Sequence, residues 1–169
     1  MKLNIGSGET KIDGFTNVDK HYKDVNLVSD MGKLPYANHS IEAIYASHCL
    51  YYHKLQDIKN TLKEWYRVMD WHGDLYLAVL DFDAIIELYN KNGKVMDRAV
   101  LAFLHGMQRY SWMTHMVSFN FNSLKDLLKE AHFKDIKRVE RFPLNVDDCS
   151  LMIDSTYHIP MSLNVMAKK

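Results

Sequence analysis

The sequence predicts a single α/β domain built on a mainly parallel sheet. Short apolar segments that fit β-strands alternate with segments of helical periodicity, and several of these strands are followed directly by glycine or aspartate. The length of 169 residues suits one domain with one core, and 47% hydrophobic and 25% charged residues are typical of a globular protein. Because strand and helix units alternate, we expect a sheet covered on both faces that binds ligands at the carboxyl ends of its strands.

Four strands are expected in the first 50 residues. They cover residues 2–5, 15–19, 26–30 and 41–47. The first is followed by Gly6-Ser7-Gly8, the second ends in Asp19 and the third in Asp30. Only about a dozen residues separate the first two strands, which is too short for a full crossover helix.

The central part of the chain carries the clearest helical pattern. Apolar residues recur at three- and four-residue steps from Leu55 to Met69, which predicts an amphipathic helix. We expect His72-Gly73-Asp74 to end this helix and residues 75–80 to form a fifth strand. Residues 82–110 have helical spacing, with a break near Asn92-Gly93.

The last third is less regular. An aromatic and histidine-rich stretch at 110–115 is followed by a helix that Ser123 would cap and that would run through Ala131. Two final strands are expected at 136–142 and 161–167. The connection between them, residues 143–160, is unusually long, which indicates function or mobility.

The glycine turn and the two strand-end acids are the candidate binding residues. The Gly6-Ser7-Gly8 turn lets backbone approach a ligand closely, although a simple tight turn is the favoured explanation of this triplet taken alone. Asp19 is placed to accept hydrogen bonds from ribose hydroxyls, and Asp30 follows the next strand; each is alternatively a turn former. A third glycine and a long first crossover are missing, which argues against NAD.

These segments together resemble a known family. The runs are Leu-Asn-Ile-Gly-Ser-Gly-Glu at 3–9, Gly-Phe-Thr-Asn-Val-Asp at 14–19 and Leu-Val-Ser-Asp-Met-Gly-Lys-Leu-Pro-Tyr at 27–36, with further matches at 40–48, 62–68, 73–76, 124–133 and 162–168. They resemble the predicted S-adenosylmethionine (SAM)-dependent methyltransferases of the type 11-like group, which are often associated with sugar and surface-polysaccharide genes.

The resemblance implies a Rossmann-like class I methyltransferase fold. It implies a seven-stranded, mainly parallel sheet with an antiparallel last strand and a shortened first crossover, and SAM as the cofactor. The implied cofactor-binding residues are the Gly6-Ser7-Gly8 turn for the methionine portion, Asp19 for the ribose, Asp30 with the Met31 backbone for the adenine edge, and Ser47 near the sulfonium.

Candidate catalytic residues are His48 and His115. Methyl transfer depends mainly on positioning, but a hydroxyl acceptor benefits from a general base such as histidine. Where relatives commonly have His-x-Leu-Glu-His, this chain has Tyr51 in place of the acid. Either histidine is alternatively structural. His48, Cys49 and His53 have no further ligand pair, so no metal is expected.

We therefore expect a SAM-dependent methyltransferase that acts on a small molecule or a sugar or glycan precursor, in polysaccharide biosynthesis. The alternative is a non-catalytic SAM-binding or interaction module of the same fold. The 21 basic and 21 acidic side chains balance, which argues against nucleic acid as partner. No apolar run is long enough for a signal peptide or a membrane span, so we expect a cytoplasmic protein. We also expect a homodimer.

Overall fold

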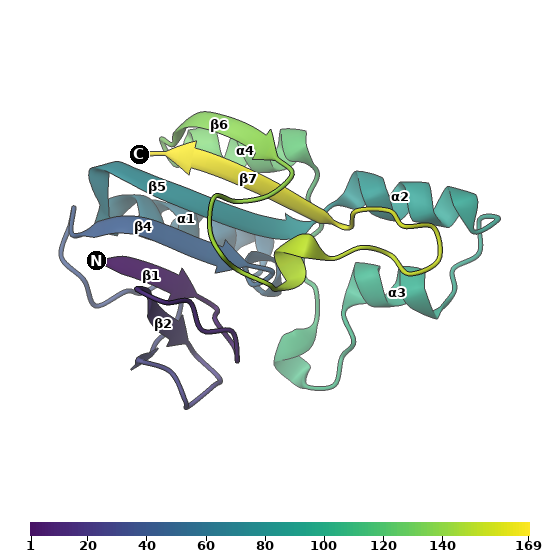
Figure 1. The fold of residues 1–169 in the computed structure, drawn as a ribbon, viewed down its shortest axis with the longest axis horizontal. Helices are drawn as coiled ribbons and strands as arrows, with labels where there is room; N and C mark the ends of the chain where they lie inside the picture. Colours follow the sequence, from purple (N-terminus) through teal and green to yellow (C-terminus); the bar gives the residue numbers. More distant parts are fainter.

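The computed structural model describes residues 1–169 as one seven-stranded sheet with strand order β3-β2-β1-β4-β5-β7-β6 (Figure 1). The strands are β1 (Lys2–Ile5), β2 (Thr16–Asp19), β3 (Leu27–Val28), β4 (Ile41–Ser47), β5 (Met69–Leu80), β6 (Lys134–Val139) and β7 (Ser162–Lys168). The α-helices are α1 (Leu55–Val68), α2 (Phe82–Lys91), α3 (Arg98–His105) and α4 (Phe121–Glu130). Single 3₁₀ turns are η1 (Leu50–Tyr52), η2 (Ser111–Met113) and η3 (Cys149–Leu151).

The strand directions confirm the expected topology. β1 pairs in parallel with β2 and β4, β2 with β3, and β4 with β5, whereas β7 runs antiparallel to both of its neighbours. Residues 6–15 connect β1 to β2 without a helix, so the shortened first crossover is also confirmed. The strand order reverses between β1 and β4, and such a switch point is where open α/β sheets bind ligands.

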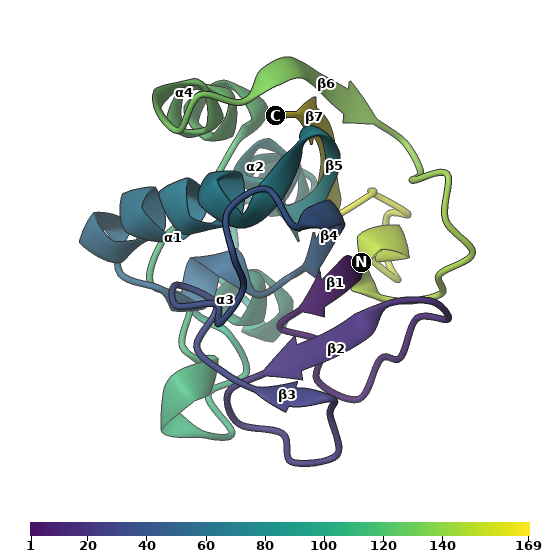
Figure 2. The same ribbon diagram turned by 90° about the vertical axis from the view of Figure 1, so that its left-hand side faces the viewer.

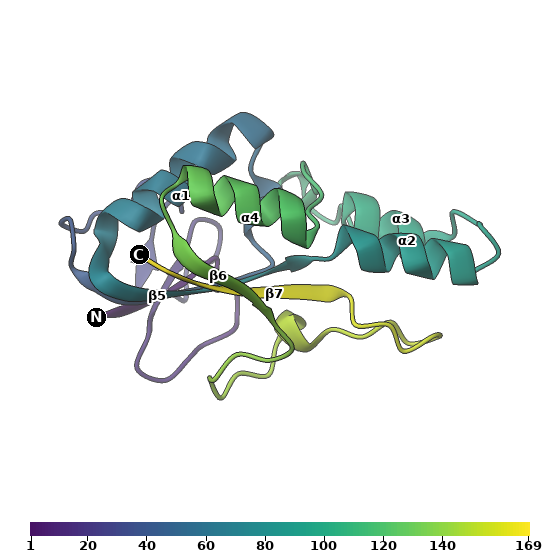
Figure 3. The ribbon, with the colours of Figure 1, turned by 90° about the horizontal axis from the view of Figure 1, so that it is seen from above.

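The two faces of the sheet are covered differently. Helices α1 and α4 lie side by side on one face, and no α-helix lies over the opposite face (Figures 2 and 3). Instead, the opposite face carries a small cluster built around Ile12, Tyr45, Ala78 and Phe142. The Tyr45 and Phe142 rings meet edge to face, with centroids 5.6 Å apart. The sheet is therefore covered on both faces as expected, but by helices on one side and mainly by loops on the other.

Helix α1 forms because its apolar residues share one face. Ile58, Leu62 and Trp65 are fully buried against the sheet. The boundary after α1 differs from the expectation: β5 begins at Met69, directly after the helix, so His72 and Gly73 lie within the strand and do not end the helix. The reason is tertiary, because Met69 pairs with Ile41 of β4.

Two helix starts depend on side-chain caps. The prediction that Ser123 caps α4 is wrong, because Asn120 is the N-cap: its side chain accepts from the Ser123 N–H, and Ser123 Oγ accepts from the Asn120 N–H. Asp81 caps α2 by accepting from the Asp83 N–H. None of the helices has the length and apolar character needed to cross a bilayer.

Candidate functional site

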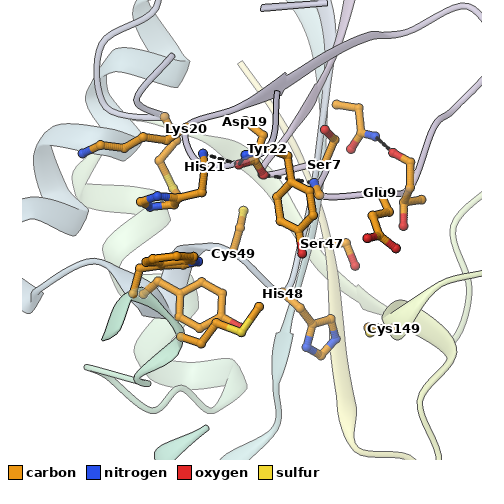
Figure 4. A pocket seen from close by; sticks show the side chains of 18 of the residues that line it. Ser7, Glu9, Asp19, Lys20, His21, Tyr22, Ser47, His48, Cys49 and Cys149 are labelled. Carbon is orange, nitrogen blue, oxygen red and sulfur yellow. Dashed lines mark hydrogen bonds between the residues drawn. The ribbon is translucent and has the colours of Figure 1, made fainter. Parts of the chain in front are cut away.

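A cavity of about 490 Å³ lies at the carboxyl ends of β1, β2 and β4, where the strand order reverses (Figure 4). Its walls come from six segments: the turn after β1, the segment after β2, the segment after β3, the end of β4 with η1, and two segments from the second half of the chain. In Figure 4, His21 and Cys149 lie on opposite sides of this cavity. The cavity volume is within the range of about 300–1,000 Å³ common for small-molecule sites.

The glycine turn after β1 is required by packing. Gly6 has φ +65°, and a Cβ at this position would lie 2.3 Å from Cys49 Cβ, so only glycine fits. The Gly8 N–H donates to Asp19 Oδ2 at 3.0 Å. The turn therefore lines the cavity while it is held between the loops that follow β2 and β4.

Asp19 organises the side of the cavity formed by the turn after β1 and the segment after β2. Its Oδ1 accepts from the backbone N–H groups of His21 at 2.7 Å and Tyr22 at 3.1 Å, in addition to the Gly8 bond on Oδ2. A carboxylate has about four acceptor positions, so roughly one remains for a ligand. Asp19 thus joins the β1 turn to the segment after β2 and still faces the cavity.

Asp30 and Met31 lie one strand further out. The Asp30 carboxylate accepts from Lys20 Nζ at 2.8 Å and from the Gly32 N–H at 2.9 Å. Burial alone would raise the Asp30 pKa, but these two donors lower it overall. Asp30 does not line the cavity, whereas Met31 does. The Met31 carbonyl is fixed by a 2.9 Å hydrogen bond from Trp65 Nε1.

Two serine hydroxyls in the cavity wall have no partner. Ser7 Oγ, in the glycine turn, and Ser47 Oγ, at the end of β4, are both buried and make no hydrogen bond. Both residues line the cavity. Buried polar side-chain atoms are nearly always satisfied in proteins, so two exceptions in one wall call for an explanation by a ligand or water.

His48 is held by hydrogen bonds on both ring nitrogens. Asn164 donates through Nδ2 to two backbone carbonyl oxygens, so its Oδ1 faces Ser162 and accepts the Ser162 hydroxyl proton at 3.0 Å. Ser162 Oγ therefore accepts from His48 Nε2–H, at 2.9 Å. Nδ1 is then the bare nitrogen, and it accepts the Tyr51 hydroxyl proton at 3.1 Å. This network fixes the His48 tautomer.

Burial keeps His48 neutral. Loss of hydration lowers its pKa from the usual value to about 4, and the negative charge of Asp148 only partly opposes this shift. Burial also raises the pKa of Tyr51 well above its usual value. Although His48 lines the cavity, its basic nitrogen is occupied by Tyr51 and is a weak base.

Comparison with known proteins agrees with this geometry. Residues 10–77 match the sequence profile of a family described as a methyltransferase domain. The whole chain superposes on solved SAM-dependent methyltransferases.

The chain has a class I methyltransferase fold.

Three solved structures illustrate the similarity. A SAM-dependent methyltransferase from Archaeoglobus fulgidus is 16% identical, with a TM-score of 0.62 over 99% of this chain and 85% of that one. A SAM-dependent methyltransferase from Thermotoga maritima is 17% identical, with a TM-score of 0.61 over 99% and 81%. The 1,6-didemethyltoxoflavin-N1-methyltransferase of Burkholderia thailandensis, solved with that compound and S-adenosylhomocysteine, is 14% identical, with a TM-score of 0.62 over 99% and 70%. A search of curated proteins finds no match.

Within this methyltransferase fold, the structure brings most of the predicted residues together. Gly6, Ser7, Gly8, Asp19, Met31, Ser47 and His48 all line the cavity. His115 does not: its Nδ1 donates to the Phe103 carbonyl oxygen at 3.0 Å, and its ring packs on Tyr51 with centroids 4.3 Å apart. His115 therefore packs against Tyr51, which lines the cavity, but does not line the cavity itself.

Two further parts of the cavity wall come from the less regular segments of the chain. Trp112 and Met113, from the irregular segment between α3 and α4, line it, and the Trp112 ring stacks on His21 with centroids 4.8 Å apart. Asp148 and Cys149, from the long β6–β7 connection, line it on another side. The only sequence signals for them were the aromatic content of residues 110–115 and the unusual length of residues 143–160.

Proposed function

We propose that this protein is a SAM-dependent methyltransferase acting on a small molecule or a sugar or glycan precursor. The observation that carries the proposal is the cavity at the switch point of a class I methyltransferase fold, with the unsatisfied hydroxyls of Ser7 and Ser47 in its wall. These hydroxyls and the free acceptor position of Asp19 suit a ligand that carries both hydrogen-bond donors and acceptors, as SAM does.

Different residues around the cavity bind different parts of SAM. We assign the Gly6-Ser7-Gly8 turn to the methionine portion, Asp19 to the ribose and the Met31 backbone to the adenine edge. Asp30 does not line the cavity, so we assign it to holding this segment in place through its bonds with Lys20 and the Gly32 N–H. Bound SAM supplies a methyl group activated by its sulfonium. The protein contributes orientation and exclusion of water, for which the stacked His21 and Trp112 rings close one side of the cavity.

Aromatic side chains support the acceptor assignment. Tyr51, Tyr52 and Trp112 line the cavity, and Tyr110 stacks on Trp112 with centroids 4.6 Å apart. Flat apolar rings with polar edges suit a planar compound or a sugar ring. The Burkholderia neighbour was solved with 1,6-didemethyltoxoflavin bound, which supports the small-molecule class. The glycan class rests on the sequence resemblance.

A non-catalytic SAM-binding module is the second candidate, and one observation favours it. Of the three histidines that line the cavity, His48 is the one that directly follows Ser47, and its basic nitrogen is already bound to Tyr51. Release of S-adenosylhomocysteine in the presence of an acceptor supports the enzyme, whereas cofactor binding without turnover over a broad panel of hydroxyl and amine acceptors supports the binding module.

The first experiment is calorimetric titration with SAM and S-adenosylhomocysteine, with NAD as the negative ligand. In the Ser7→Ala and Ser47→Ala variants we expect SAM affinity to fall by about three- to tenfold, the worth of one hydrogen bond, with no loss in free energy of unfolding because neither hydroxyl has a protein partner.

Ser162→Ala is the matched control for the stability measurement. Its hydroxyl bonds both His48 and Asn164, so we expect removal to lower the free energy of unfolding by about 1–3 kcal/mol. Unchanged SAM affinity in both Ser7→Ala and Ser47→Ala would contradict the assigned binding mode. Absence of SAM binding to the folded wild-type protein would contradict the proposed function itself.

A further inference from the structure

Asp148 reaches the cavity from the far end of the chain. It is the N-cap of η3, where its Oδ1 accepts from the Ser150 N–H at 2.8 Å. Its Oδ2 accepts from the Tyr45 hydroxyl at 2.8 Å. Tyr45 lies on β4 and is fully buried, and burial raises its pKa, so it remains a protonated donor. The carboxylate is therefore held in place by two bonds, one of them from β4.

The Asp148 charge has no cation partner. No lysine, arginine or histidine nitrogen lies within 4.0 Å of its carboxylate, because it takes part in none of the ion pairs of the protein. Two of its roughly four acceptor positions are used, which leaves two for a ligand. A carboxylate charge without a cation partner attracts a cationic ligand.

The other charged residues that line the cavity also favour a cationic ligand. Its lining contains three carboxylates, those of Glu9, Asp19 and Asp148, and one lysine, Lys20. Lys20 is already paired with Asp30 at 2.8 Å. The carboxylate of Asp19 is satisfied largely by backbone N–H groups. The cavity as a whole is thus suited to a ligand with positive charge.

The contact of Asp148 with β4, through Tyr45, determines which positive charge its carboxylate faces. Tyr45, its partner, precedes Ser47 by two residues on the same strand and so shares its face of the sheet. The Asp148 charge also acts on His48, the next residue after Ser47. Asp148 therefore acts at the end of β4, near Ser47 and His48.

We propose that Asp148 is the residue by which this site distinguishes SAM from its demethylated product, because its carboxylate faces the sulfonium charge. This inference rests on the proposed function. S-adenosylhomocysteine has a neutral thioether where SAM has the sulfonium, and the two share every other charged group. Loss of the charge on methyl transfer would then weaken binding of the product and favour its release.

The test is calorimetry with three ligands: SAM, S-adenosylhomocysteine, and sinefungin, which carries a protonated amine in place of the methylated sulfonium. For Asp148→Asn we expect SAM and sinefungin to bind about tenfold more weakly, from the Coulomb energy of a pair several ångströms apart in a partly hydrated site, and S-adenosylhomocysteine to bind within twofold of wild type. Asparagine retains the N-cap function, so η3 should persist.

Asp147→Asn is the matched control, because it removes the same charge from the adjacent, exposed residue that does not line the cavity. It should leave all three affinities unchanged. If Asp148→Asn weakened the binding of all three ligands equally, the inference would be overturned, and Asp148 would contact a group that SAM and its product share. If none of the three affinities changed, the inference would also be overturned, and Asp148 would serve only as the N-cap of η3. If none of the ligands binds the wild-type protein, the proposed function fails and this inference fails with it.

Discussion

His48 combines three unusual properties in one residue. It has a left-handed backbone with φ +52°, it is buried, and both ring nitrogens have partners inside the protein. A non-glycine residue in this conformation costs free energy and persists only where its surroundings hold it. Here the hydrogen-bond network through Ser162 and Asn164 holds the ring, so His48 positions Tyr51 at the cavity wall.

The depressed pKa of His48 makes stability depend on pH. In the native state His48 stays neutral down to about pH 4, whereas an unfolded histidine binds a proton near pH 6.5. Between these values the unfolded chain binds more protons, so stability is fully present above about pH 6.5 and falls as the pH drops toward 4. The loss is of order 3 kcal/mol. We expect urea unfolding of His48→Asn to show a flatter dependence over this range.

The control for this prediction is His72→Asn, which replaces an exposed histidine. Burial also lowers the pKa values of His53 and His115, so part of the pH dependence should remain in every variant. Asparagine tolerates a positive φ, which limits the backbone cost at position 48. An unchanged slope in His48→Asn relative to His72→Asn would show that His48 is not held neutral.

At the scale of elements, the turn after β1 and the start of η1 form one packed unit. The Gly6 N–H donates to the Val18 carbonyl oxygen of β2 at 2.8 Å, and Cys49 Sγ contacts the Ile5 carbonyl oxygen at 3.4 Å. Burial raises the pKa of the Cys49 thiol to about 12, so this cysteine is an inert packing group. The cavity floor therefore depends on how closely these two backbone segments approach each other.

Gly6→Ala tests this close approach. The added Cβ would meet both Cβ and Sγ of Cys49 within 3 Å, in addition to the cost of a left-handed backbone. We expect a loss of about 2–5 kcal/mol in the free energy of unfolding and loss of SAM binding. Gly93→Ala is the control, because Gly93 has nearly the same φ, +66°, with no atom within 4 Å.

The two glycine variants separate backbone strain from packing. We expect Gly93→Ala to cost only about 1–2 kcal/mol and to leave SAM binding intact. The free energy of unfolding is measured by urea unfolding and the SAM affinity by calorimetry, on the same preparations of each variant. Equal losses of stability in the two variants would mean that Cys49 yields to the added methyl group and that the packing is not limiting.

At the scale of the whole molecule, the cavity is closed by segments far apart in the sequence. The chain runs from β5 into α2 and α3, which extend beyond the sheet, and returns through residues 106–117 to place Trp112 against His21 (Figure 1). The β6–β7 connection brings Asp148 to the same cavity. Exposed apolar side chains on α2 and α3, among them Ile86 and Leu101, are compatible with the predicted homodimer, which stays a prediction.

Trp112→Ala tests whether this closure serves the cofactor. Trp112 is 43% exposed, so its removal should change the free energy of unfolding little, while loss of the stack on His21 should weaken SAM binding by about five- to tenfold in calorimetry. Trp71→Ala is a close control: Trp71 is 60% exposed and stacks on His39 with centroids 4.2 Å apart, at the opposite end of the sheet. Equal affinity in the two variants would exclude a role for Trp112.

The elements whose signal is local could be predicted from the sequence alone. The apolar run of β4 and the helical periodicity of α1 were predicted to within one residue, because burial of one face imposes a fixed period on the chain. The glycine turn and Asp19 were also identified, since both follow directly from strand ends.

The rest of the site depends on contacts between segments that are distant in the sequence. It placed Trp112 and Asp148 in the cavity wall, removed His115 from it, and fixed the proton of His48 through residues more than 100 positions away. These outcomes have no periodic signal, because they depend on which segments the folded sheet brings together and on how burial changes the free energy of a charged group.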